Sequence, residues 1–292
     1  LYTKKFNQQL HNPLGLAAGP HTQLAQNIVA GWLCGARYIE LKTIQENDRI
    51  EVSKPCIDMH NEGYNCEWSQ ELTVEQSYDQ YLDAWILIHI LNHRLFSKKK
   101  KNLDVGTIFN MSVGYSLRDV RGEKVQWFID KMLDCSKEKK EKIKQILPLY
   151  PDIDKIDIPD QISDSVTLST MHGCQPREIE YIAKFLMIEK KLHTVIKFNP
   201  TLLGSGSVRA ILNKSRGYDI EIPDSTFDED INYIDAIRLI DTVGKTAREM
   251  DLHIGIKISN TLEVINKNTQ LPASEQKVYM SGIALHPIAV NL

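Results

Sequence analysis

The chain has 292 residues, and 35 Lys and Arg residues against 38 Asp and Glu residues give it a formal net charge of −3. Hydrophobic residues make up 42% and charged residues 25%, which excludes a disordered or fibrous protein and leaves one large globular domain or two modest ones. The near-neutral charge disfavours electrostatic binding to nucleic acid. No apolar run approaches the roughly 18–20 residues that span a bilayer, so we expect a cytoplasmic protein without a membrane partner.

The cysteines are scattered along the chain and include no C-x-x-C pair. An odd, widely spaced set disfavours a disulfide framework, a structural zinc site and an iron–sulfur cluster held within this chain. We therefore predict no metal site among them. They are Cys34, Cys56, Cys66, Cys135 and Cys174.

Short apolar segments alternate with segments of helical periodicity, which is typical of βα units around a parallel sheet. The expected strands are Pro13–Ala18, Tyr38–Lys42, Gly106–Val113, Ser165–Thr170, Thr194–Phe198 and His253–Ile258. The expected helices are Gln23–Cys34, Thr73–Leu95, a segment with Val125, Phe128, Ile129 and Met132 on one face, Pro176–Lys190 and Ile231–Glu249. The second helix opens with a capping box, because Thr73 and Gln76 have the required types and spacing.

Two further segments bear on the architecture. Glu46–Trp68 predicts a long loop after the second strand, and loops of that length are uncommon unless they are functional. Tyr279–Leu292 predicts the start of another helix. Six strands are fewer than a (β/α)8 barrel contains, so periodicity leaves open both a doubly wound open sheet and a barrel without its last two units. We find no linker that divides residues 1–292, and therefore predict a single domain.

The first expected strand runs into Ala17-Ala18-Gly19-Pro20, whose small side chains would let a flat ligand approach the backbone. The alternative is a tight turn that packs on itself. This turn does not have the G-x-G-x-x-G pattern, which disfavours a dinucleotide-binding domain.

Three lysines, Lys42, Lys197 and Lys257, stand at or near the ends of expected strands. An ammonium group among apolar strand residues is costly unless it meets an anionic partner, so recurrence at three strands favours a common anionic ligand. The alternative is that each lysine extends its ammonium group to solvent.

The segment that follows the fourth strand, Ser169–Cys174, supplies a hydroxyl, an imidazole and a thiol immediately before a helix N-terminus. The positive end of that helix could lower the pKa of a cysteine and favour acid–base chemistry. A turn with an incidental histidine is the alternative.

Together these pieces resemble the flavin-binding barrel of dihydroorotate and dihydropyrimidine dehydrogenases, and most closely the flavin domain of selenate reductase subunits. The resemblance covers nearly the whole chain. Its most specific stretches are Asn12–Gln26, Ile39–Thr43, Lys54–Asp58 with Glu62–Asn65, Ser169–Cys174 and Lys197–Gly204.

The resemblance implies a (β/α)8 TIM barrel of the α/β class that binds FMN at the C-terminal ends of its strands. Positive charge near the flavin would stabilise its reduced, anionic form. The implied cofactor-binding residues are Ala17, Ala18, Gly19, Lys42, Thr43, Asn110, Lys197 and Asn260, with the two asparagines as hydrogen-bond donors to the flavin or substrate. The implied substrate-binding residues are Asn65 and Asn199.

The proton-transfer residue of that family is a cysteine in the loop after the fourth strand. In this chain, alignment by position places His172 nearest that cysteine, whereas residue type favours Cys174. Both are candidate catalytic residues.

In the same family, glycine-rich turns after the last two strands hold the FMN phosphate, and Ser205-Gly-Ser207 lies at a different place. The resemblance therefore predicts a fragment of a longer chain, with about six of eight βα units present. Iron–sulfur clusters, FAD and NAD(P)H would belong to other electron-transfer domains or subunits.

The resulting hypothesis is an FMN-dependent oxidoreductase that transfers hydride between the flavin and a small pyrimidine- or purine-like heterocycle. Two alternatives stay open. One is a flavin-free barrel lyase or aldolase in which Lys42, Lys197 or Lys257 forms a Schiff base with a carbonyl substrate. The other is a non-catalytic electron-relay subunit.

Overall fold

The structure, a computed structural model, describes residues 2–49, 53–60, 62–66, 72–96, 104–170, 172–267 and 271–292. The chain divides into two compact units. The first comprises Leu1–Asp48, Leu72–Val113 and Arg118–Thr167, and the second comprises Arg49–Glu71, Gly114–Leu117 and Leu168–Leu292.

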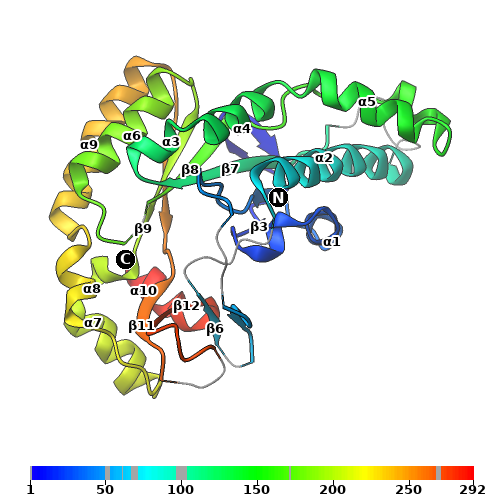
Figure 1. The fold of residues 1–292 in the computed structure, drawn as a ribbon. Helices are drawn as coiled ribbons and strands as arrows, with labels where there is room; N and C mark the ends of the chain where they lie inside the picture. The colour runs from blue at the N-terminus through cyan, green and yellow to red at the C-terminus, as the bar shows by residue number, and fades with distance from the viewer. Residues whose placement is uncertain are drawn as a thin grey trace. The chain divides into compact units, whose positions relative to one another are not determined.

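The first unit contains parallel strands and the helices that pack beside them. β3 pairs in parallel with β4, and β4 pairs in parallel with β7, so that Ile39 lies opposite Phe109. α1 packs against α2, the long cyan helix of Figure 1, and α2 packs against α4. The bounds are β3 Gly15–Leu16, α1 Ala25–Leu33, β4 Tyr38–Glu40, α2 Val74–Phe96, β7 Ile108–Tyr115 and α4 Glu123–Leu133.

Helix α2 begins where its sequence predicts. The backbone N–H of Thr73 donates to Gln76 Oε1 at 2.9 Å, and the backbone N–H of Gln76 donates to Thr73 Oγ1 at 3.3 Å. This reciprocal capping box satisfies two donors that the first turn of a helix leaves without a partner. The side chains that α1, α2 and α4 bury include Ile28, Trp32, Tyr81, Leu82, Ile86, Phe128, Ile129 and Met132.

The second unit contains the last two expected strands and the final residues of the fourth. β9 and β10 pair in parallel, with Lys197 directly opposite Lys257, and the last residues of β8 lie beside β9. α6 and α9 pack against each other, as Figure 1 shows. The bounds are β8 Ser165–Thr170, α6 Pro176–Ile188, β9 His193–Phe198, α9 Tyr233–Glu249 and β10 Ile254–Ile258.

A small antiparallel sheet, which the sequence did not predict, also belongs to the second unit. Its strands are β5 Ile57–Asp58, β6 Gly63–Asn65, β11 Leu262–Ile265 and β12 Lys277–Ser281, in the order β11-β12-β6-β5. Side chains alternate between the two faces of a strand. One face therefore places Leu262, Val264, Val278 and Met280 in a buried apolar cluster with Val208, Leu212, Leu285 and Ile288. The other face carries polar residues.

The remaining elements are short or peripheral. β1 and β2 form an antiparallel hairpin in the first unit. Their bounds and those of the other α-helices are β1 Thr3–Lys5, β2 Gln8–Leu10, α3 Leu117–Val120, α5 Ser136–Ile146, α7 Ser205–Arg209, α8 Asp224–Glu229 and α10 His286–Asn291.

All six expected strands are confirmed, with boundaries that differ by a few residues. The helix expected from Tyr279 is wrong at its start, because Lys277–Ser281 forms β12 and α10 begins only at His286. Val278 and Met280 alternate with more polar neighbours, a period of two that favours a strand. The described part of Glu46–Trp68 is likewise not all loop, since it holds β5 and β6.

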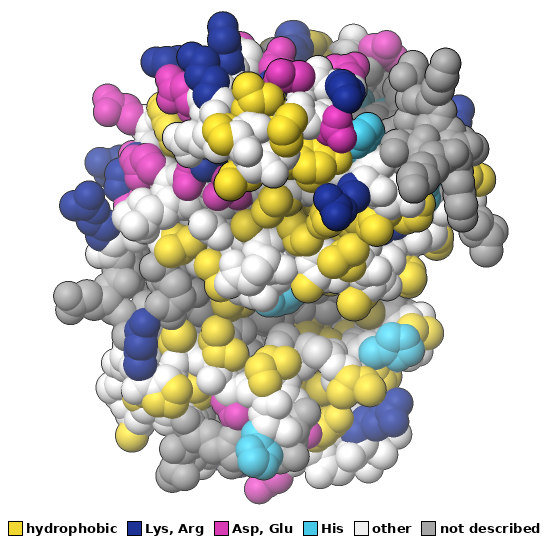
Figure 2. Space-filling model, turned by 90° about the vertical axis from the view of Figure 1, so that its right-hand side faces the viewer, with side chains coloured by type: hydrophobic (Ala, Val, Ile, Leu, Met, Phe, Trp, Pro, Cys, Tyr) yellow, Lys and Arg dark blue, Asp and Glu magenta, His cyan; other side chains and the backbone are white. Residues whose placement is uncertain are grey.

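In the part of the chain that the structure describes, no helix combines the length and the hydropathy that crossing a bilayer requires. The face drawn in Figure 2 intersperses Lys and Arg side chains with Asp and Glu side chains, in keeping with the net charge of −3.

Replacing Phe128 with Ala is expected to destabilise the first unit by about 3–5 kcal/mol, because the ring is fully buried and meets Tyr81 edge-on with centroids 6.1 Å apart. Urea unfolding followed by circular dichroism measures the loss. The matched control is Leu149→Ala, since Leu149 is 86% exposed and its truncation should change stability by less than about 0.5 kcal/mol. Equal unfolding midpoints for the two variants would contradict the assigned core.

Candidate active site

The second unit gathers polar side chains that follow three strands. His172 lies in the loop after β8, Asn199 directly after β9, and Asn260 two residues after β10. The Asn260 amide donates to Asn199 Oδ1 at 2.9 Å, and Asn199 Nδ2 lies 3.2 Å from His172 Nδ1. Residues at the carboxyl ends of neighbouring parallel strands meet at one edge of a sheet, which is where ligands bind in α/β folds. The structure therefore brings together three of the residues predicted from the sequence.

Local sequence fixes these positions. Pro176 occupies the first turn of α6, so the chain between β8 and α6 must turn at Gly173, whose φ of +78° favours glycine. Pro200 likewise starts a 3₁₀ turn immediately after Asn199. The backbone N–H of Asn260 donates to the carbonyl of Phe198 at 2.7 Å, which ties the end of β10 to the end of β9.

A buried carboxylate, Asp230, joins the same cluster. Asp230 Oδ1 accepts the backbone N–H of Gly173 at 3.0 Å, and Oδ2 accepts the Thr201 hydroxyl at 2.8 Å and lies 3.5 Å from His172 Nδ1. Burial alone would raise the pKa of Asp230, but the hydrogen bonds and charge of His172, Gly173 and Thr201 outweigh it and lower that pKa. The site thus keeps a negative charge beside the imidazole at neutral pH.

An aromatic ring and a polar row line the cluster. Tyr279 stacks on His172, with ring centroids 5.2 Å apart and an interplanar angle of 30°. In the small sheet Tyr279 lies opposite Glu263 on one side and Asn65 on the other, so the three side chains share a face. The Tyr279 hydroxyl donates to Glu263 Oε2 at 3.4 Å, and Lys277 pairs with Glu263 at 2.6 Å. Asn65 therefore stands one strand away from the ring that packs on His172.

Lys197 and Lys257 occupy matching positions on β9 and β10. Side chains at paired positions of neighbouring strands point to the same face, so the structure places two of the three strand lysines side by side. Both are partly buried. Adjacent cationic groups favour an anionic ligand on that face.

Cys174 is buried and bonded to its own loop. Cys174 is 9% exposed. Burial and the nearby Glu178 carboxylate raise the pKa of its thiol to about 12, although the hydrogen bond with Thr170 lowers that pKa in part. The helix N-terminus therefore does not yield a reactive thiolate here, contrary to one reading of the sequence.

In the first unit, the small-residue turn lies beside His21, on which the charge of Lys42 acts. Ala17 is exposed, while Ala18 and Gly19 are partly buried. A Cβ added at Gly19 would come within 2.8 Å of the His21 ring, so the imidazole lies close to this backbone. Partial burial lowers the pKa of His21, the Ala17 carbonyl opposes this, and the positive charge of Lys42 adds to it. Thr43 bonds through its hydroxyl to Ser112 at 2.8 Å.

Asn110, on β7, is completely buried. Its Nδ2 donates to Thr167 Oγ1 at 2.7 Å and to the carbonyl of Met111 at 3.0 Å, whereas Oδ1 has no hydrogen-bond partner among the described residues. The donor role expected for Asn110 therefore does not suit its geometry. The side-chain atom of Asn110 that has no partner among the described residues is an acceptor, Oδ1.

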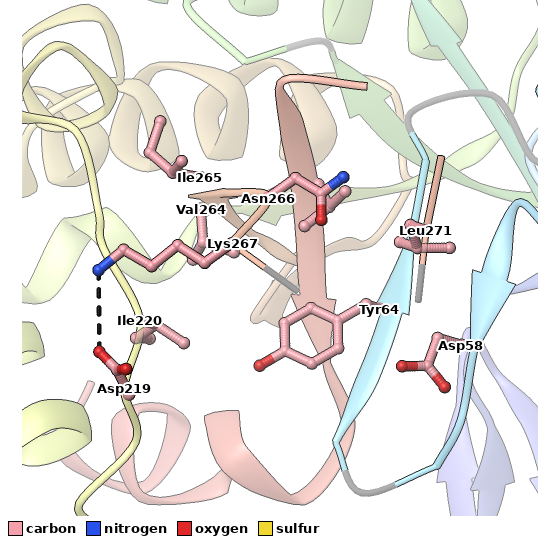
Figure 3. Close-up of a pocket in the computed structure, with 10 residues that line it drawn as sticks. Asp58, Tyr64, Asp219, Ile220, Val264, Ile265, Asn266, Lys267 and Leu271 are labelled. Carbon is pink, nitrogen blue, oxygen red and sulfur yellow. Dashed lines mark ion pairs between the residues drawn. The ribbon is translucent and has the colours of Figure 1, made fainter. Parts of the chain in front are cut away.

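A separate open pocket of about 330 Å³ lies by the small sheet. Figure 3 shows the Tyr64 ring between the Lys267–Asp219 ion pair on one side and Asp58 on the other. The lining of the pocket mixes apolar and polar side chains, and it includes none of the residues predicted to bind cofactor or substrate. The strand-end cluster, not this pocket, is the candidate active site.

Sequence reasoning missed Asp230, Tyr279 and Glu263. Asp230 ends an acidic run that looks like a solvated surface, and Tyr279 lies in a segment expected to be helical. A period-two pattern at Lys277–Ser281 was the one signal that could have placed Tyr279 on a strand. In the described residues, no group of three or more His, Cys, Asp or Glu side chains is arranged to hold a metal ion.

Comparison with known proteins assigns the family. Residues 2–292 match the family model described as "Oxidoreductase YgfK, N-terminal TIM-barrel domain". The chain is also 41% identical over 314 aligned positions to proteins named "Putative oxidoreductase YgfK" from Escherichia coli K12 and Escherichia coli O157:H7. The chain belongs to this family of YgfK N-terminal barrel domains. The alignment covers 98% of this chain and 29% of each relative, so the chain spans less than a third of their length.

Family membership decides the architecture that periodicity left open. The βα units of this YgfK-type domain belong to a TIM barrel, and not to a doubly wound open sheet. In a TIM barrel, catalytic and ligand-binding side chains come from the C-terminal ends of several strands. His172, Asn199 and Asn260 follow the ends of β8, β9 and β10 in this way.

In this YgfK-type domain, Cys174 is expected to react with N-ethylmaleimide far more slowly than the exposed Cys34 at pH 8. A rise of the pKa from 9.0 to about 12 leaves roughly a thousandth of the usual thiolate, and burial hinders access as well. Peptide mass spectrometry after timed labelling measures both rates, and labelling in urea is the control in which the two should converge. Equal rates in the folded protein would show that Cys174 is a reactive thiol.

Proposed function

We propose that this chain is the FMN-binding part of an oxidoreductase that exchanges hydride with a planar, amide-rich heterocycle of the pyrimidine or purine type. The observation that carries the proposal is the strand-end cluster of the second unit. There the amides of Asn260 and Asn199, the His172 imidazole and the Asp230 carboxylate each lie 2.9 to 3.5 Å from the next. Membership in a family named for an oxidoreductase supports the reaction class. The resemblance to dihydroorotate and dihydropyrimidine dehydrogenases supports the finer assignment.

The residues present suit a flavin in two respects. The partly exposed turn Ala17–Gly19 carries only small side chains of its own, with the His21 imidazole beside Gly19, and Asn110 Oδ1 is a buried acceptor without a partner among the described residues. Flavins present N–H donors and a flat face, which match such an acceptor and such a backbone. When bound, FMN supplies the hydride chemistry, which no side chain can supply.

The residues that would hold the flavin each have a distinct task. The turn at Ala17, Ala18 and Gly19 would lie against the ring, and Asn110 would accept a hydrogen bond from it. Lys42, next to Thr43, and Lys197 would place positive charge at the ring edge, which favours the reduced cofactor.

The amide groups suit a heterocycle that carries both donors and acceptors. Asn260 and Asn199 are bonded to each other, and Asn65 lies on the polar face of the small sheet beside Tyr279. An amide offers one acceptor and two donors, so it can pair with the edge of a pyrimidine or purine ring. Asn65, Asn199 and Asn260 are therefore the proposed substrate contacts.

A proton must move at the carbon next to the one that exchanges hydride. The loop after β8 supplies two alternative candidates for this step, His172 or Cys174. Electrons would reach this domain from modules that bind FAD, NAD(P)H or iron–sulfur clusters elsewhere in the protein or in partner subunits. The proposed setting is the cytoplasm, with a small molecule as substrate and neither nucleic acid nor membrane as partner.

Replacing Lys197 with Ala in the full-length protein is expected to weaken FMN retention about tenfold, equivalent to ~1.4 kcal/mol, or to lower the flavin reduction potential, because a nearby positive charge is lost. Chromatography and mass spectrometry of the released cofactor measure occupancy, and spectroelectrochemistry measures the potential. The matched control is Lys245→Ala, on the exposed side of α9, which should change neither quantity. Unchanged occupancy and potential in Lys197→Ala would remove this lysine from the flavin site.

Absorption, borohydride trapping and turnover measurements on the purified protein distinguish the alternative functions. An FMN enzyme should absorb in the visible and oxidise or reduce a pyrimidine or purine. A Schiff-base lyase should instead be colourless and be trapped on lysine by borohydride with a carbonyl substrate. An electron-relay subunit should show flavin redox activity with no turnover of any heterocycle.

A further inference from the structure

Nδ1 of His172 faces two different partners, while Nε2 faces none. Asn199 Nδ2 lies 3.2 Å and Asp230 Oδ2 lies 3.5 Å from Nδ1. Nε2 is buried and makes no hydrogen bond to any described residue. A buried polar atom without a partner is costly, which indicates an atom aimed at a ligand.

The Asn199 amide favours the neutral form of the His172 ring. Asn199 Oδ1 accepts the Asn260 N–H, so the other end of the Asn199 amide, a donor, points at His172 Nδ1. A neutral imidazole can accept that N–H at Nδ1 when it carries its own hydrogen at Nε2. Asn199 therefore stabilises the neutral form of the ring.

The Asp230 carboxylate favours the protonated form of the His172 ring. An imidazolium has hydrogens on both nitrogens, so it can no longer accept the amide N–H, and the nearby acceptor for Nδ1–H is Asp230 Oδ2. Asp230 is held in place by the Gly173 N–H and the Thr201 hydroxyl whether or not the ring is protonated. The two neighbours of Nδ1 thus favour opposite charge states of His172.

Other titratable groups near the ring or its loop are Tyr279, Glu229 and Cys174. Tyr279 stacks on it, and the Tyr279 hydroxyl is turned to Glu263, one strand further away. The Glu229 carboxylate would lie 3.7 Å from a Cβ at Gly173, and the buried Cys174 thiol follows in the same loop. Among the described residues, Asp230 is the carboxylate within 4 Å of an imidazole nitrogen of His172.

We infer that Asp230 is a positioning residue that stabilises protonated His172, and that proton transfer passes through Nε2 of His172 and not through the Cys174 thiol. The stacked Tyr279 ring and the Nδ1 contacts fix the plane and direction of the imidazole. This inference deepens the proposed function, on which it rests for the identity of the proton acceptor.

The proton balance of the step is simple. In the direction that reduces the substrate, the Nε2–H bond of the imidazolium breaks, and its electron pair stays on the ring as the Nε2 lone pair. The proton forms a C–H bond at the substrate carbon next to the hydride-accepting carbon. Nδ1–H stays with Asp230, and solvent returns a proton to Nε2 after product leaves.

Exchange of the imidazole C2 hydrogen for deuterium tests the Asp230 part without flavin, substrate or activity. Mass spectrometry of the peptide that contains His172, from the full-length protein at a series of pH values, gives the titration midpoint of this ring. Asp230→Asn should move the midpoint to lower pH, because the opposite charge beside Nδ1 is lost. Asn199→Ala should move it to higher pH, because the neutral ring loses its donor.

Control variants distinguish the loss of the Asp230 charge from a general loss of folding. Asp228→Asn removes an exposed carboxylate of α8 two residues away and should leave the midpoint unchanged. Asp230→Glu should restore at least part of the shift, and near-ultraviolet circular dichroism checks that each variant is folded. If Asp230→Asn does not fold, the shift in Asn199→Ala and the titration of wild type carry the test. A His172 midpoint that neither Asp230→Asn nor Asn199→Ala moves would overturn the inference.

Turnover of a heterocycle by the holoenzyme tests the proton-transfer part. The pH limb on which reduction falls as pH rises should move to lower pH in Asp230→Asn by the same amount as the C2 midpoint, and Cys174→Ala should retain that limb. If Cys174→Ala abolishes turnover and His172→Ala does not, the assignment to Nε2 is wrong. If the midpoint shifts as expected but no variant or wild type turns over any heterocycle, the proposed function fails and the Asp230–His172 pair stands.

Discussion

The carboxylate of Asp230 imposes the constraint on which the candidate site depends. An ionised carboxylate that is 8% exposed would be strongly destabilising without hydrogen-bond donors, so the chain has to bring donors to it. Gly173 supplies one from the loop after β8, and Thr201 supplies another from the turn after β9. Satisfying one buried charge therefore fixes the positions of two strand-end loops. His172 and Asn199, which adjoin those donors in sequence, are fixed along with them.

The small sheet contributes the Tyr279 ring to this site because side chains alternate along a strand. Because side chains alternate between faces, the residues that pack the apolar cluster leave their neighbours on the opposite face. Val278 and Met280 enter the cluster, and Tyr279 between them is left to stack on His172. The core packing of β12 therefore also holds the Tyr279 ring against His172.

Residue type and environment pointed to different proton carriers in the loop after β8. Cysteine is the expected type there by resemblance, but burial raises the pKa of Cys174, which makes its thiol a weaker acid and leaves little thiolate to act as a base. His172 has a buried nitrogen without a partner in the described chain, and a carboxylate beside its other nitrogen. The surroundings of the two residues therefore differ, and this difference is the basis for inferring the imidazole, not the thiol, as the proton carrier.

The sequence by itself determined the six βα strands, the long helices and the capping box at Thr73, because these depend on periodicity and on residues at most a few positions apart. It also marked His172 as a candidate in the loop after the fourth strand, while Asn199 and Asn260 were implied by the family resemblance. Only the tertiary structure revealed Asp230, the Tyr279 stack and the small sheet. Asp230 meets Gly173 across 57 residues, and Ser281 meets Gly63 across 218. Contacts at such separations leave no local pattern, because burial and hydrogen-bond satisfaction arise only when the chain has folded.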